Sequence, residues 1–171
     1  MLTLESKFSD YVEALKKAGA CAEVVAIHDE MLKKNPDLIV NDVYKTFVEN
    51  PNLDEGWPTW ALQLIGEEMD VTFRTSIITD LIRTPKACLQ LLNDCKSLTE
   101  EERILLKSKY NGKLTAIKDP MEAARLYIDC APVLTAAESL ELKSVFEGKL
   151  PTVEKELATG IVVRATAEVA P

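Results

Sequence analysis

The feature that most constrains the fold is a tandem duplication in the second half of the chain. Residues 98–114 read LTEEERILLKSKYNGKL and residues 134–150 read LTAAESLELKSVFEGKL, so nine of the 17 aligned positions are identical. Unrelated segments would share about one position at ordinary residue frequencies. The flanking residues extend the match to a unit present twice, over 84–117 and 119–153.

Each copy has the residues that typically begin and end the two helices of a helix hairpin. Thr99 with Glu102 has the spacing of a capping box, in which the hydroxyl accepts a hydrogen bond from an exposed amide and the carboxylate reaches back. Thr135 with Glu138 repeats this spacing. A proline in the first turn begins the preceding helix of each copy, and a glycine follows the last turn. A repeat of this length is typical of helical arrays, although the tetratricopeptide consensus is absent from both copies.

The rest of the chain also has a helical pattern. Apolar residues recur with a period near 3.6 over 4–15, 21–32, 39–48, 57–65 and 73–82. Asn35-Pro36 is expected to end one helix and begin the next. We predict an all-α fold of about nine helices in stacked helix hairpins, either a short helical-repeat array or an irregular bundle.

A single helical domain is predicted over 1–157, followed by a C-terminal tail over 158–171. Ile161 and Val163 belong to a stretch in which apolar and polar residues alternate, which is a strand period. One strand cannot satisfy its own backbone, so the tail either pairs with another chain by strand addition or is a frayed terminus.

Charge and composition narrow the classes of function. The net charge of −8 and the isoelectric point of about 4.8 disfavour binding to a nucleic-acid backbone. No apolar run reaches the roughly 18 residues that a membrane span needs, and no signal-peptide pattern opens the chain. We therefore expect a cytoplasmic protein with no membrane association. Its four cysteines contain no C-x-x-C pair and are expected to be reduced and structural.

Catalytic and metal-binding patterns are weak. His28 is the single histidine and lies on an apolar stripe, which favours a packed ring with one nitrogen satisfied. Helical MazG-type pyrophosphohydrolases hold Mg²⁺ with Glu-x-x-Glu followed later by Glu-x-x-Asp; Glu138 and Glu141 match the first half of this pattern, but no Glu-x-x-Asp follows. The acidic cluster at 67–70 has a different spacing and is expected to be solvated. We predict no catalytic residue, no metal ligand and no cofactor.

Trp57 and Trp60, in the segment Gly-Trp-Pro-Thr-Trp, are the strongest candidates for contacting a partner, because tryptophan is enriched in binding hot spots. The alternative interpretation places both in the core. The sequence favours a non-catalytic helical interaction protein, that is an adaptor, assembly factor or regulator, which binds another protein through Trp57, Trp60, Ile161 and Val163. A small all-α enzyme using carboxylates and a divalent metal is one alternative. A structural subunit that forms homo-oligomers through its tail is another.

Overall fold

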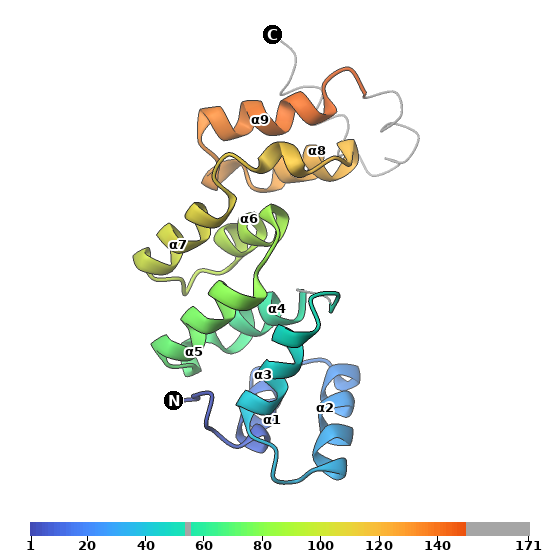
Figure 1. Cartoon of the computed structure of the whole chain (residues 1–171), viewed down its shortest axis with the longest axis vertical. Helices are drawn as coiled ribbons and strands as arrows, with labels where there is room; N and C mark the ends of the chain where they lie inside the picture. Colours follow the sequence, from blue (N-terminus) through green and yellow to red (C-terminus); the bar gives the residue numbers. More distant parts are fainter. Residues whose placement is uncertain (54–55, 150–171) are drawn as a thin grey trace. The chain divides into compact units, whose positions relative to one another are not determined.

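The computed structural model of the chain describes residues 1–53 and 56–149. Nine α-helices and no β-sheet occur within these residues, which confirms the all-α prediction. The chain divides into two compact units, Met1–Arg83 and a second that begins at Thr84. The assignment of 1–157 as one domain stays a prediction. Figure 1 labels the helices.

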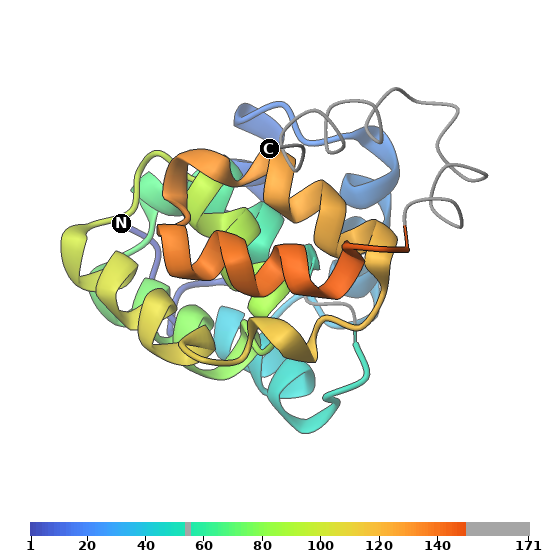
Figure 2. The ribbon, with the colours of Figure 1, turned by 90° about the horizontal axis from the view of Figure 1, so that it is seen from above.

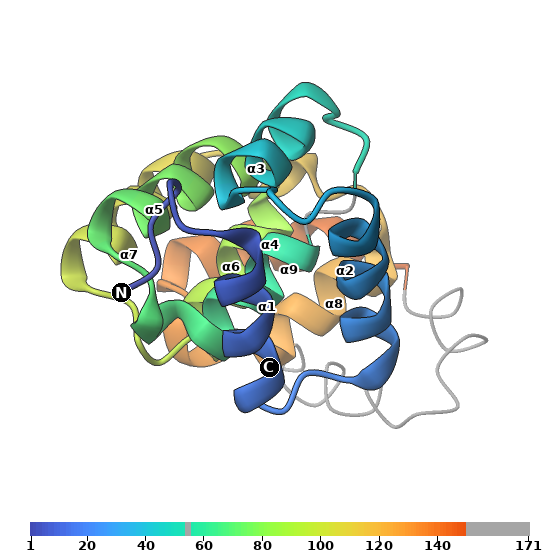
Figure 3. The ribbon, with the colours of Figure 1, turned by 90° about the horizontal axis from the view of Figure 1, so that it is seen from below.

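Unit 1 contains five α-helices, one 3-10 turn and one π-helical turn. These are α1 (Phe8–Lys17), α2 (Ala22–Lys34), α3 (Val40–Glu49), α4 (Gly56–Ile65), η1 (Gly66–Glu68), α5 (Val71–Ser76) and the π turn η2 (Ile77–Leu81). Helix α1 packs against α2 and α4, and Figure 3 shows α1 and α2 side by side. The segment before α1 contains a turn at residues 4–5, and Leu2 pairs with the backbone on both sides of Met69.

One predicted helix boundary is wrong. Helix α3 begins at Val40, whereas the sequence indicated a start at Pro36. The residues between them are held by the segment before α1: the Phe8 amide donates to the Leu38 carbonyl at 2.8 Å, and the Val40 amide donates to the Ser6 carbonyl at 2.9 Å. Because these tertiary bonds satisfy the backbone, the chain does not need helical bonds there.

The helices of unit 1 differ greatly in burial. The core contains fully buried side chains from α1, α4 and the π turn, including Leu15, Leu62 and Ile78. By contrast, α2 buries one side chain, His28, and α3 buries one, Val40. The other apolar side chains on these two helices are half-buried or exposed. Part of the apolar surface of α2 and α3 therefore stays accessible to solvent, and Ile27 and Val48 are the exposed large apolar residues on these helices.

Unit 2 contains the duplicated segments, which form two matching helix pairs. The first is α6 (Pro85–Asp94) with α7 (Glu100–Tyr110), and the second is α8 (Pro120–Asp129) with α9 (Ala136–Phe146). The first helix of each pair has 10 residues and the second has 11. Figure 2 shows α8 and α9 side by side, and these two helices make the most extensive helix–helix contact of the unit.

The predicted start and stop signals of the helices in the duplicated segments are confirmed. Both capping boxes form. The hydroxyls of Thr99 and Thr135 accept from the backbone amides of Glu102 and Glu138, and the carboxylates of these glutamates accept from the threonine amides. Gly112 and Gly148 follow the second helices with φ of 70° and 77°, which only glycine adopts without strain. The duplication is thus a repeat of local structure as well as of sequence.

Candidate functional site

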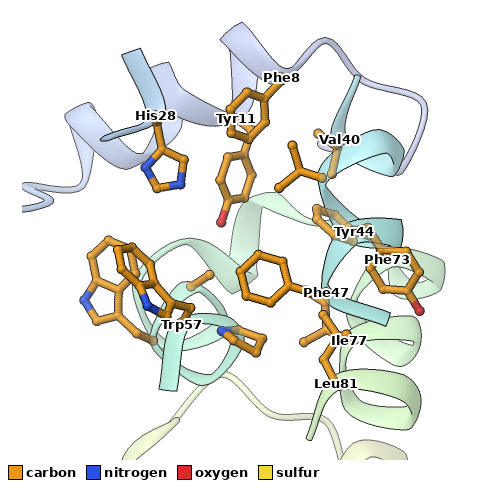
Figure 4. Close-up of a pocket in the computed structure, with 14 residues that line it drawn as sticks. Phe8, Tyr11, His28, Val40, Tyr44, Phe47, Trp57, Phe73, Ile77 and Leu81 are labelled. Atoms are coloured by element: carbon orange, nitrogen blue, oxygen red, sulfur yellow. The ribbon is translucent and has the colours of Figure 1, made fainter. Parts of the chain in front are cut away.

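An aromatic pocket in unit 1 is the strongest candidate for a functional site. Figure 4 shows it between α1, α2, α3 and α4, with α5 and the π turn completing the wall. Its lining consists of Phe8, Tyr11, His28, Val40, Val43, Tyr44, Phe47, Trp57, Pro58, Trp60, Ala61, Phe73, Ile77 and Leu81. Eight of these 14 side chains are aromatic. No described residue in the lining carries a carboxylate, an ammonium or a guanidinium group.

Five of the rings form a continuous series of contacts along one side of the pocket. The Phe8 and Tyr11 rings are stacked, with centroids 5.6 Å apart, and both contact His28. His28 reaches the Trp57 ring at a centroid distance of 6.0 Å. Trp57 and Trp60, three residues apart on α4, meet edge to face at 6.4 Å. These contacts connect α1, α2 and α4, so the pocket wall is a cross-helix cluster rather than the surface of one helix.

Two polar atoms face this apolar surface. The Nδ1 atom of His28 donates to the Val24 carbonyl at 2.7 Å, because a carbonyl can only accept. In the neutral ring, Nε2 is then an acceptor. The Tyr11 hydroxyl points into the pocket in Figure 4, and no described residue forms a hydrogen bond with it. Burial raises the pKa of Tyr11 to about 12. The pocket can therefore accept a hydrogen bond at Nε2 and donate or accept one at Tyr11.

Helix α3, which forms the opposite wall, is attached to the π turn by polar contacts. The Tyr44 hydroxyl donates to the Asp80 carboxylate and also approaches the Ser76 carbonyl at 3.3 Å. Burial, followed by the hydrogen bond to Asp80, raises the pKa of Tyr44 above its ordinary value. Arg83 donates to the Phe47 carbonyl at 3.2 Å and so satisfies a backbone group at the end of the helix. These bonds fix α3 although the helix buries little.

The pocket is small, and part of its lining is open to solvent. Its free volume is about 70 Å³. Phe8 and Phe73 are buried in its floor, whereas Tyr11, Phe47 and Trp57 are half-buried and keep part of their surface in contact with solvent. Half-exposed rings around a cavity form an arrangement that can take an apolar group without refolding of the protein.

The structure brings two of the four predicted partner-binding residues together. Trp57 and Trp60 lie in the same pocket wall and are half-buried, so neither is a fully buried core residue. Ile161 and Val163 lie outside the described residues. Sequence reasoning missed Tyr11, Tyr44 and Phe47, which read as members of separate helical stripes. One signal was available: seven of the ten Phe, Trp and Tyr residues lie before residue 74.

The residues considered for catalysis have structural roles. His28 is packed with Nδ1 satisfied, as predicted. Glu138 completes a capping box, and Asp70 caps α5 by accepting from the Phe73 amide at 2.7 Å. Glu67 and Glu68 are exposed. Across the described parts of the chain, no three His, Cys, Asp or Glu side chains converge as a metal-binding group.

Cys88, Cys95 and Cys130 are buried and form no disulfide, as expected of structural thiols. Cys21 is instead exposed, at the N-cap position of α2. None of the described helices is long and apolar enough to cross a membrane. Comparison with protein-family models, with curated proteins and with solved structures finds no match to this chain.

Proposed function

We propose that this protein is a non-catalytic helical interaction protein, which binds another protein through the aromatic pocket of unit 1. One observation supports the proposal above all others. Half-buried rings from α1, α3 and α4 surround an uncharged cavity, and Trp57 lies among them. Binding hot spots are commonly tryptophan and tyrosine side chains that surround a pocket of this kind.

The location and partner class follow from charge and cysteine chemistry. None of the four cysteines forms a disulfide, which supports a reducing compartment, and we place the protein in the cytoplasm. The net charge of −8 supports a protein partner over nucleic acid. The partner would be an assembly component or a regulated protein, with Trp57 and Trp60 supplying the central contact.

Affinity capture from the native host tests the proposal. The intact chain and the Trp57→Ala variant are used side by side, with Leu140→Ala as the matched control. Leu140 is 65% exposed and lies in unit 2, so its loss removes a surface apolar group outside the pocket. Truncating a central hot-spot tryptophan costs about 2 kcal/mol or more, which is roughly a thirtyfold loss of affinity.

The expected result is a specific protein retained by the intact chain and by Leu140→Ala but lost with Trp57→Ala. Circular dichroism of each variant shows whether it is still helical. Should Trp57→Ala lose its helical signal, Phe47→Ala replaces it, because Phe47 lines the opposite wall. A partner that both pocket variants retain at full strength would contradict the proposal.

A further inference from the structure

We infer that the pocket receives one aliphatic side chain, a leucine or a methionine, from a basic amphipathic helix of the partner. The inference rests on the proposed function and names the chemistry of the partner. It is drawn from the size of the pocket, from the helices on either side of it, and from the distribution of charge between the two units.

Pocket size limits the group that enters. The free volume is about 70 Å³. An engineered cavity of roughly 150 Å³ binds a benzene molecule, and the free volume of this pocket is about half of that. The branched end of leucine or the thioether end of methionine is smaller and flexible enough to fit against rings. Aromatic lining with an aliphatic occupant is therefore the better match.

The flanking helices indicate what carries that side chain. On α2, Val24 and Met31 lie on the same face as His28 and are half-buried. On α3, Val43 and Phe47 line the pocket and are also half-buried. A partner that covers both flanks must present an apolar stripe at least 100° wide, as an amphipathic helix does. A partner that binds as a strand would need a sheet edge, which the described residues lack.

The net charge of unit 1 indicates which residues the polar face of the partner carries. Residues 1–83 contain 15 acidic and 8 basic side chains, so unit 1 carries seven of the eight net negative charges of the chain. The described lining itself is uncharged, while Asp80 is exposed beside the wall residue Tyr44. An apolar pocket within a strongly acidic unit favours lysine and arginine around the anchoring side chain, through a field that salt screens.

A peptide library tests this chemistry directly. The probe is a displayed library of randomised 16-residue peptides, selected on the full chain and counted on three single variants. Phe47→Ala removes a pocket ring. Val48→Ala is its matched control, because Val48 is the next residue of α3, is 39% exposed and does not line the pocket. Val48→Lys changes the charge at the same exposed position, where either side chain can reach solvent.

We expect selected peptides with leucine or methionine at helical spacing and a net positive charge. Phe47→Ala should weaken them about tenfold or more, and Val48→Ala less than about twofold. Val48→Lys should weaken them through like-charge repulsion even if Phe47→Ala proves unstable, and raising the salt should do the same. The two tryptophans of the chain both line the pocket, so quenching or a blue shift of their emission on adding a peptide confirms where it binds.

Four results would overturn the inference: acidic selected peptides, proline-rich ones, retention unaffected by Phe47→Ala, or no enrichment over a blank surface. These failures are separable from failure of the proposed function. If native capture depends on Trp57 while the library gives any of these results, the pocket binds a protein of different chemistry. If capture does not depend on Trp57 either, the pocket is not the partner site.

Discussion

Two tyrosines that line the same pocket should differ in how much stability is lost when the hydroxyl is removed. Tyr44 donates to the Asp80 carboxylate and approaches the Ser76 carbonyl, whereas no described residue bonds to the Tyr11 hydroxyl. A hydrogen bond to a charged group contributes about 1.5–3 kcal/mol. Asp80 is exposed, so the bottom of that range applies, and Tyr44→Phe should cost about 1.5 kcal/mol. Tyr11→Phe removes a desolvated hydroxyl and should be neutral within about 0.5 kcal/mol or slightly stabilising.

The assay is urea unfolding followed by tryptophan emission. Trp57 and Trp60 are the two tryptophans of the chain, so excitation at the red edge of the indole band reports on unit 1 alone. Circular dichroism, which reports on all helices, is recorded in parallel because two units need not unfold in one step. If Tyr11→Phe lowers the urea midpoint as much as Tyr44→Phe does, the assignment of the α3 attachment to the Tyr44–Asp80 bond is wrong.

Three further predictions concern other parts of the chain. Cys21 should react with a thiol reagent in the native protein while the three buried thiols do not, since burial raises the pKa of Cys130 to about 12; all four should react in denaturant, as counted by mass spectrometry. The folded pKa of Tyr11 is about 12 and the unfolded value is 10.0, so the unfolded state ionises first and the protein loses stability as the pH rises from 10 to 12. That alkaline loss, up to about 2.7 kcal/mol, should be reduced in Tyr11→Phe when urea midpoints are compared across pH. Thr99→Ala and Thr135→Ala should each lower the free energy of unfolding by about 1 kcal/mol, as measured by circular-dichroism melts. A difference above roughly 1 kcal/mol between the two variants would show that the two capping boxes are not equivalent.

The parts of the fold that local chemistry decides could be predicted from the sequence. The capping boxes, the proline-initiated helices and the glycine at the end of α7 depend on residues within one turn of each other. The start of α3 could not be predicted in this way. Pro36 favours a helix locally, but Pro36 and Asp37 form a turn, and hydrogen bonds with residues 6 and 8 hold Leu38 and Val40 before the helix can start. Tertiary pairing overrode a local preference that was correctly read.

The candidate site was predictable only in part, for a related reason. Trp57 and Trp60 could be singled out because tryptophan is rare and both occur in one short segment. Tyr11, His28 and Phe47 each fit the apolar stripe of their own helix, and the period of one helix does not say which other helix its stripe faces. Their convergence is a property of how α1, α2, α3 and α4 pack, which a single sequence does not display.

The weak burial of α2 connects the stability of unit 1 to its proposed function. A 13-residue helix is marginal in water by itself, and α2 buries only His28 within its own unit. The His28 contacts with Phe8, Tyr11 and Trp57 therefore account for much of what orders the helix, and these same rings form the pocket wall. A ligand that fills the pocket would add apolar contacts to this weakly buried helix. Binding would then stabilise α2 more than the well-buried α4, because the free energy gained by mass action acts on the part of the protein that is otherwise free to open.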